Sequence, residues 1–302
     1  MRAILLATLL VAACGGDNDG DWVVQTVPEQ AFVAPYTLWV FSETDVWLGG
    51  SSLWHWDGSA WREAAAPANT GIVDFWGFAP DDLWAIGSDI VFHWDGSAWS
   101  EVAANNGVVL DTLVVAWGTS STDLWIANAN NSRIYHWDGT TWTRTTLQFV
   151  QAQAMWGSSS SDIWLSGITD AYHWDGSTWT EYEADTEPRD AWGLWGFASD
   201  DVWAAGSFDS LMHWDGTTWT TEVDEFDTYN GIWGAATDDI YAVGDFGVVS
   251  HFDGTKWSTR QRQLGSGFGR NFTTVHGSSS TNVWATAVDL ETFTTMVLRF
   301  EQ

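Results

Sequence analysis

Cysteine and lysine are nearly absent from this chain of 302 residues, with Cys14 the only cysteine and Lys256 the only lysine. A lone cysteine near the N-terminus leaves the rest of the chain without any disulfide, so its core must hold together by packing. Ten basic residues stand against 40 acidic ones, giving a formal net charge of -30. A surface this acidic repels nucleic acid and anionic membranes, and it favours solubility. We therefore expect no nucleic-acid partner.

Long apolar runs are missing as well, apart from one at the N-terminus. Arg2 precedes an apolar segment, residues 3–13, that is too short to span a bilayer. Positive charge, apolar run and small residues together predict a signal peptide over residues 1–13. No other segment predicts a transmembrane helix.

The end of this segment, Val11-Ala12-Ala13-Cys14, resembles the bacterial lipobox. The resemblance implies that Cys14 carries the lipid anchor, including palmitate, and becomes the mature N-terminus, followed by a short linker over residues 14–18. Ordinary cleavage near Cys14, or a stray thiol, is the alternative. We expect a bacterial cell-envelope protein anchored by lipid in the outer membrane or at the cell surface.

Tryptophan, by contrast, is abundant: 26 residues, most of them on a repeating lattice. Each repeat holds four aromatic positions, and seven copies follow one another. The first position is occupied by Trp39, Trp76, Trp117, Trp156, Trp195, Trp233 and His276. The second is occupied by Trp47, Trp84, Trp125, Trp164, Trp203, Tyr241 and Trp284. The third and fourth positions of a copy are typified by Trp214 and Trp219. Apart from Trp22, only Trp54 and Trp192 lie off this lattice.

Four short segments rich in β-branched and aromatic residues make up each copy, here called strands a to d in chain order. Asp-Gly pairs such as Asp215-Gly216 supply the positive φ of a tight turn between strands c and d. No helical period of apolar residues persists. Four antiparallel strands recurring about every 40 residues predict an all-β fold, a seven-bladed β-propeller over residues 19–302. The regular aromatics are then interpreted as packing between blades, with a sugar-stacking ladder as the alternative.

The seventh copy stops after strand c, and the missing strand lies at the other end of the chain. Residues 19–25, which include Trp22, have the pattern of a turn plus strand d. We therefore predict that an N-terminal strand closes the last blade, which leaves no exposed seam in the ring.

Spacing divides the ring into two faces. The first and second aromatics are always eight positions apart, as Trp39 and Trp47 are, whereas the b–c and d–a connections vary in length. In an up-and-down blade the b–c and d–a connections share one face, here called the variable face, and the a–b and c–d turns share the other, the constant face. Variable loops on a rigid scaffold are where recognition is expected.

The candidate binding residues all come from these variable connections. The seventh copy contributes Arg260, Arg262, Phe268, Arg270, Asn271 and Phe293, and other copies contribute Phe208, Phe246, Tyr229, Asn131 and Arg133, with Asn230 beside Tyr229. Arginine offers planar donors for carboxylates or sulfates, and phenylalanine offers stacking faces. Solvated loops whose arginines only offset local negative charge are the alternative interpretation.

Histidine and aspartate also recur at fixed positions. Six histidines fall in strand c, as His213 does, and six aspartates directly precede strand b, as Asp201 does. Equivalent residues of neighbouring blades are too far apart to share one metal ion, so we expect the histidines to form hydrogen bonds within their own blades. The aspartates are interpreted as Asx turns, with a calcium site shared with the c–d turn aspartates as the alternative. No other cofactor is expected.

Motifs for catalysis are not recognisable: there is no Gly-rich phosphate loop, nucleophile elbow or metal-binding His-Glu helix. We favour a protein that is not an enzyme, because acidic residues are too abundant to single out the carboxylate pair that a glycosidase needs.

At the level of the repeat, Trp-Gly, Asp-Val-Trp and His-Trp-Asp-Gly-x-x-Trp resemble tectonin-type propellers and, in part, the Asp-box repeats of sialidase-like propellers. The whole chain resembles Trp-rich repeat lipoproteins of bacteria. The resemblance concerns the fold more than the activity, and from the variable loops we expect a monomeric, non-catalytic surface module that recognises a glycan or a protein. A sialidase-like glycoside-active enzyme and a structural envelope scaffold are the alternatives.

Overall fold

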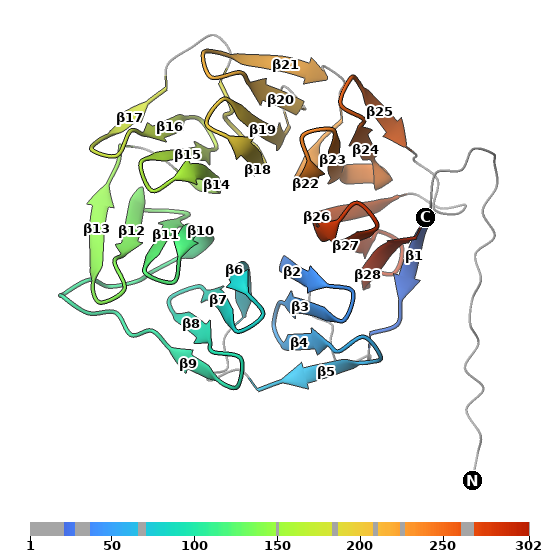
Figure 1. The fold of residues 1–302 in the computed structure, drawn as a ribbon, viewed down its shortest axis with the longest axis horizontal. Helices are drawn as coiled ribbons and strands as arrows, with labels where there is room; N and C mark the ends of the chain where they lie inside the picture. Colours follow the sequence, from blue (N-terminus) through green and yellow to red (C-terminus); the bar gives the residue numbers. More distant parts are fainter. Residues whose placement is uncertain are drawn as a thin grey trace.

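A computed structural model of the chain describes residues 21–27, 37–65, 71–148, 151–182, 187–207, 211–223, 227–260 and 269–301. The predicted signal peptide, the linker and Cys14 lie outside these residues. The described part folds into seven four-stranded antiparallel sheets arranged as a ring, as Figure 1 shows. The predicted seven-bladed propeller is therefore confirmed. No helix among the described residues is long and apolar enough to cross a membrane.

The blades follow one another in chain order, each running from an inner strand a to an outer strand d. Blade 1 comprises β2 (Thr37–Ser42), β3 (Asp45–Gly49), β4 (Leu53–Trp56) and β5 (Trp61–Ala64). Blade 2 comprises β6 (Ile72–Ala79), β7 (Asp82–Gly87), β8 (Val91–Trp94) and β9 (Trp99–Glu101). Blade 3 comprises β10 (Leu113–Ser120), β11 (Asp123–Asn128), β12 (Arg133–Trp137) and β13 (Trp142–Thr146). Blade 4 comprises β14 (Ala152–Ser159), β15 (Asp162–Gly167), β16 (Ala171–Trp174) and β17 (Trp179–Glu181).

The remaining blades have the same plan. Blade 5 comprises β18 (Ala191–Ala198), β19 (Asp201–Gly206), β20 (Leu211–Trp214) and β21 (Trp219–Val223). Blade 6 comprises β22 (Tyr229–Ala236), β23 (Asp239–Gly244), β24 (Val249–Phe252) and β25 (Trp257–Arg260), with a short 3-10 helix over Asp245–Gly247. Blade 7 comprises β26 (Arg270–Ser279), β27 (Asn282–Asp289), β28 (Thr295–Glu301) and, as its outer strand, β1 (Asp21–Gln25).

The ring closes as the sequence predicts. β1 pairs antiparallel with β28 in a register that places Asp21 opposite Glu301 and Gln25 opposite Val297, so both ends of the described chain share one blade (Figure 1). Trp22 packs against Phe300, with 5.5 Å between ring centroids. Closure therefore combines backbone pairing with an aromatic contact, and it leaves no open seam.

The lattice tryptophans pack blade against blade. Trp164 of blade 4 is fully buried and lies edge-to-face on Trp219 of blade 5, with centroids 5.2 Å apart. Trp284 of blade 7 meets Trp61 of blade 1 in the same way across the closure. Large aromatic areas buried in this geometry stabilise each blade against the next, which confirms the packing interpretation of the repeat.

The recurring histidines bond within their own blades, as expected. His213 stacks on Trp203 of strand b at 4.1 Å, and its Nε2 lies 2.9 Å from Asp201 Oδ1. The same pair recurs in the other five copies with N···O distances of 2.6 to 2.8 Å. The aspartates before strand b were interpreted as Asx turns, and for this row the interpretation is wrong. A carboxylate beside an imidazole that offers an N–H makes the stronger, charge-assisted hydrogen bond.

Candidate functional site

The turns on the constant face keep the same length because the a–b and c–d turns of a blade pack on each other. In each Asp-Gly turn the aspartate accepts hydrogen bonds from the two backbone N–H groups that follow, as Asp215 does from Thr217 and Thr218. The glycine has φ between 84° and 90° in all six copies. A Cβ on Gly216 would lie 2.7 Å from Cβ of Asp200 in the a–b turn. The spacing therefore cannot change without breaking this contact, and the constant face has no freedom to specialise.

The inner strands surround a central channel with a cavity of about 230 Å³. The side chains and backbone of β2, β6, β10, β14, β18, β22 and β26 line it. Toward the constant face the first-position aromatics form a ring. Trp39 contacts Trp76 at 5.2 Å and His276 at 4.2 Å between centroids. The residues that line the cavity end at this aromatic ring, so we expect a ligand to enter from the variable face.

His276 takes the place of a seventh tryptophan in that ring. It is 9% exposed, and its Nδ1 accepts a hydrogen bond from the backbone N–H of Val40 at 3.2 Å. Burial lowers the pKa of His276 to about 3, so the ring stays neutral. In the neutral ring the hydrogen is then on Nε2, which has no hydrogen-bond partner among the described residues. His276 meets Trp195 at 90° and 6.0 Å, the arrangement in which an N–H can approach an aromatic face.

Asp74 of blade 2 is the one acidic side chain that lines the cavity among the described residues. Its Oδ2 accepts a hydrogen bond from the Ala116 N–H at 2.8 Å, and its Oδ1 accepts one from the Phe75 N–H at 2.9 Å. Thr37 Oγ1 donates weakly to Oδ1 at 3.4 Å. Burial outweighs these bonds and raises the pKa of Asp74 to about 7. A carboxyl group poised to lose its proton near neutral pH therefore lies in the channel.

At the mouth of the channel six of the seven inner strands, all except β2, have a β-bulge that inserts one extra residue. The register shift in β14 lies between Ala152 and Ala154, and that in β22 lies between Tyr229 and Gly231. The residues inserted there differ from blade to blade: Val73, Val114, Gln153, Trp192, Asn230 and Thr273. A bulge can re-aim a side chain away from the regular alternation of a strand. The repeat thus supplies six equivalent positions at the channel mouth, and they hold five different residue types.

Gln153 and Trp192 meet at one side of this mouth. Gln153 Nε2 donates to Asp190 Oδ1 at 2.9 Å, and Trp192 Nε1 donates to the same oxygen at 3.1 Å. The Trp192 side chain remains 48% exposed. Asp190 has φ of 51°, a left-handed conformation that aspartate tolerates better than most residues. This connection holds an indole open to solvent at the rim.

Asn230 lies in the neighbouring blade. Its Nδ2 donates to Asp245 Oδ1 at 2.9 Å and to the Phe272 carbonyl oxygen at 2.7 Å. Asp245 starts the short 3-10 helix that leads to Phe246, which is 65% exposed and has φ of 54°. Asn271 Oδ1 accepts a hydrogen bond from the Phe246 N–H at 2.9 Å. The b–c connection of blade 6 is therefore built to present a phenylalanine to solvent.

Exposed apolar side chains concentrate on the variable connections. The large hydrophobic residues that are exposed in the described part of the chain are Val23, Val24, Val109, Ile168, Trp192, Phe246 and Phe293. The two valines belong to the outer strand β1, and the other five lie in b–c or d–a connections or at the start of an inner strand. Exposed apolar groups gathered on one face of a soluble fold mark interaction sites.

The structure sorts the residues that the sequence singled out. Phe246 and Phe293 are exposed, and Asn271 supports Phe246. Tyr229 is a correction: it is fully buried, with its hydroxyl 2.7 Å from Ser250 Oγ, so no ligand on the surface can contact it. It starts strand a, where the side chain points into the blade.

Arg133 and Asn131 are used within the protein. Arg133 Nη1 and Asn131 Nδ2 both donate to Asp111 Oδ2, at 2.7 and 3.1 Å. Tyr135 donates to the other oxygen, and this bond leads the interactions that lower the pKa of Asp111. Arg270 is paired in register with Asp289 across β26 and β27. Arg262, Phe268 and Phe208 lie outside the described residues, as does the side chain of Arg260.

Three residues of the channel were missed. Asp74 and Gln153 had no sequence signal beyond being polar in an apolar strand. Trp192 did have one, because it stands off the aromatic lattice beside the lattice residue Trp195. An aromatic residue that the repeat does not need is a candidate for function.

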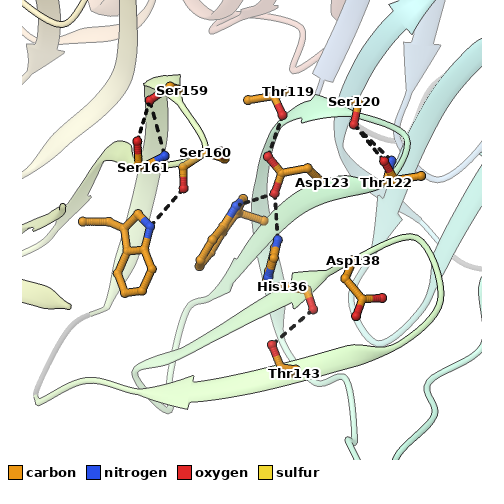
Figure 2. Close-up of polar contacts among 12 residues, drawn as sticks. Thr119, Ser120, Thr122, Asp123, His136, Asp138, Thr143, Ser159, Ser160 and Ser161 are labelled. Carbon is orange, nitrogen blue, oxygen red and sulfur yellow. Dashed lines mark hydrogen bonds and ion pairs between the residues drawn. The ribbon is translucent and has the colours of Figure 1, made fainter. Parts of the chain in front are cut away.

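The most suggestive catalytic grouping lies in blade 3, where a threonine joins the His-Asp pair of the repeat. In Figure 2, Asp123 lies between Thr119, which donates to Oδ2 at 2.5 Å, and His136, whose Nε2 is 2.7 Å from Oδ1. In a hydrolytic triad the histidine stands between the hydroxyl and the carboxylate, so that it can accept the proton. Here the carboxylate occupies the middle, and the grouping fastens strand c to the a–b turn. Among the described residues, no group of three or more His, Cys, Asp or Glu side chains could hold a metal ion.

No protein-family model matches the chain, and no curated protein matches it. Solved structures of similar fold include YCF48 bound to D1 peptide, at 14% identity and a TM-score of 0.73, covering 98% of this chain and 100% of that one. A streptogramin B lyase has 12% identity and a TM-score of 0.73, covering 93% and 97%. The extracellular domain of BT4673 from B. thetaiotaomicron has 12% identity and a TM-score of 0.71, covering 94% of this chain and 40% of that one. At these identities the likeness establishes the fold alone.

Proposed function

We propose that this protein is a non-catalytic recognition module that binds a protein or peptide on its variable face, around the mouth of the central channel. The observation that carries the proposal is the distribution of exposed apolar side chains. Trp192, Phe246 and Phe293 are all presented by variable connections, and polar contacts hold the first two in place. Aromatic side chains held open to solvent are characteristic anchors of protein interfaces.

A peptide or protein is favoured over a glycan by two considerations. The exposed residues are spread over several blades, which suits an extended partner rather than one sugar ring. A protein of similar fold, YCF48, has been solved with a peptide bound. Catalysis is not part of the proposal, because the Thr119-Asp123-His136 grouping has its carboxylate in the middle, where a hydrolytic triad has its histidine.

The experiment compares a peptide array with a glycan array, both probed with the purified protein. We expect saturable binding to a subset of peptides, lost in the double variant Trp192→Ala and Phe246→Ala. The matched control is Val24→Ser, which removes an exposed apolar side chain of 43% exposure from the outer strand β1. Binding that survives the double variant, or binding to glycans only, would overturn the proposal.

We also propose that the module is anchored by lipid on Cys14 in a bacterial envelope. The support is the sequence pattern before Cys14, together with the direction of β1, whose first residue pairs with Glu301 at the constant-face end of β28. An anchor upstream of Asp21 would hold the constant face toward the membrane and leave the variable face outward. Metabolic labelling with a palmitate analogue tests the anchor: we expect Cys14→Ser to lose the label, and equal labelling of both proteins would contradict it.

A further inference from the structure

Two amide oxygens at the channel mouth are hydrogen-bond acceptors without a donor. Gln153 Oε1 and Asn230 Oδ1 are buried and have no hydrogen-bond partner in the described structure. Their orientation is dictated by chemistry, because each amide NH₂ faces groups that can only accept: the Asp190 carboxylate for Gln153, and the Asp245 carboxylate and a carbonyl for Asn230. Both amides must therefore turn their oxygens away from these partners. Unsatisfied buried acceptors are costly, and a ligand with donors would relieve them.

Asp74 adds a carboxylate to the same cavity. Its three protein donors leave part of the accepting capacity of the two oxygens unused. No Lys or Arg side chain lines the cavity in the described part of the chain, and His276 contributes no charge because it is neutral. The channel is therefore acidic and short of donors at its mouth.

The volume of the cavity and the exposed indole at its rim both suit a cationic ligand. Across the ring from Asp74, blades 5 and 6 contribute Gly193 and Gly231 to the lining, where the next inner strand approaches each glycine closely. A cavity of about 230 Å³ has room for a long side chain, since a water molecule takes about 30 Å³ of liquid. Trp192 stands at the rim with its indole exposed, and an indole face attracts ammonium and guanidinium groups.

We propose that the channel mouth is a binding pocket for a cationic side chain, the ammonium of Lys or the guanidinium of Arg, carried by the partner. The inference rests on the proposed function and names the chemistry of its ligand. The cation lies against Trp192, donates to Gln153 Oε1 and Asn230 Oδ1, and faces the Asp74 carboxylate. The net charge of -30 draws such a partner to the surface before it docks.

This pocket binds with a characteristic pH dependence. With a pKa of about 7, Asp74 is mostly protonated in the empty channel at pH 6 and mostly ionised at pH 8. The cation binds the ionised form, so binding at pH 6 releases the Asp74 proton to solvent. His276, the other titratable group that lines the cavity, stays neutral across this range. Asp190 and Asp245, which hold the two amides, are charged groups at the mouth, and Arg270, paired in register with Asp289, begins the inner strand β26. We expect affinity to rise about tenfold from pH 6 to pH 8.

The test uses small probes rather than the unidentified partner. Nα-acetyl-lysine methylamide and Nα-acetyl-arginine methylamide are titrated into the purified protein, followed by ligand-observed NMR, with Nα-acetyl-norleucine methylamide as the uncharged control. We expect the two cationic probes to bind and the norleucine probe not to bind. Asp74→Asn should weaken binding at pH 8 at least tenfold and abolish the pH dependence. Asp89→Asn removes an exposed carboxylate from a b–c connection of the same blade, so it serves as the charge-matched control and should change little.

A second variant covers the case in which Asp74→Asn folds poorly. Trp192→Leu changes an exposed residue, and it should weaken the cationic probes several-fold while Val24→Ser, on the outer strand β1, does not. Equal binding of lysine and norleucine probes, or cationic binding untouched by both pocket variants, overturns the inference. Displacement of the probes by micromolar Ca²⁺ would also overturn it, because the oxygens would then form an ion site. Array peptides that bind through Trp192 and Phe246 without needing Lys or Arg would leave the proposed function standing while the inference fails.

Discussion

The two ends of the propeller axis obey different rules. On the constant face, six copies of one turn repeat the same aspartate, the same glycine and the same contact with the a–b turn. At the channel mouth, equivalent bulge positions hold Gln153, Trp192 and Asn230 in three successive blades. Residues that repeat from blade to blade are those that the ring needs to close. Residues that depart from the repeat lie where the molecule has specialised. The predictions below test that contrast, from the largest expected effect to the smallest.

Removing β1 tests the closure of the ring, which occurs in blade 7 only. A chain that begins at Pro28 loses the five-residue pairing with β28 and the contact between Trp22 and Phe300. We expect its melting temperature to fall by more than ~10 °C, or the protein to aggregate through the open edge. Calorimetry and light scattering measure this, and an unchanged melting temperature would refute the closure.

Trp164→Ala and Trp192→Ala remove the same side chain from the two regions. Trp164 is fully buried between blades 4 and 5, so its loss should cost about 3–5 kcal/mol. Trp192 is half exposed, so its loss should cost less than about 1 kcal/mol. Chemical denaturation gives both values. Equal costs would mean that the mouth is as structural as the lattice.

Gly216→Ala and Gly107→Ala make the same comparison for the backbone. Both glycines have positive φ, 89° and 73°. A Cβ on Gly216 meets the a–b turn, whereas one on Gly107, in a d–a connection, has nothing within 4 Å. We expect Gly216→Ala to cost about 1–3 kcal/mol more than Gly107→Ala. A similar cost for both would show that the turn contact has little influence.

Asp74 and Asp215 should respond to pH in opposite directions. The folded-state pKa of Asp74 lies near 7, above its ordinary value of 3.8, so its ionisation destabilises the fold increasingly as pH rises from about 4 to above 7. Asp74→Asn should therefore gain a few degrees in melting temperature over wild type at pH 8 and none at pH 4.

The Thr217 hydroxyl and two backbone N–H groups lower the pKa of Asp215 to about 2. That carboxylate stabilises the fold above pH 4 and loses this contribution as pH falls toward 2. Asp215→Asn should be less stable than wild type at pH 7 and equal to it near pH 2. Melting curves across pH for both variants check the two slopes, and slopes of the same sign would contradict the assignment.

The sequence alone predicts the fold because the same four-strand pattern occurs in it seven times. The aromatic lattice, the Asp-Gly turns and the N-terminal copy of strand d each predicted a feature that the structure has. Local pairing was less predictable. The aspartates before strand b bond to histidines about a dozen positions away, and turn rules do not consider such partners.

The channel mouth was the least predictable region, for two physical reasons. The d–a connection that leads into blade 6 ends before Tyr229, which starts β22 and is buried, and the bulge after it brings Asn230 to the channel. The free oxygens of Gln153 and Asn230 depend on carboxylates supplied by other connections, Asp190 and Asp245. Of these residues, only Trp192 had a signal in the sequence, because it is an aromatic residue outside the repeating lattice.

Hydroxyl-radical footprinting tests the central claim most directly, because it compares the variable face with the outer strand of one molecule in one experiment. The purified protein is oxidised alone and with the strongest peptide from the array. We predict that the peptide protects Trp192 and Phe246, while Val24 on the outer strand keeps its rate. Unchanged oxidation of Trp192 and Phe246 under saturating peptide would contradict the account and move the binding surface elsewhere on the ring.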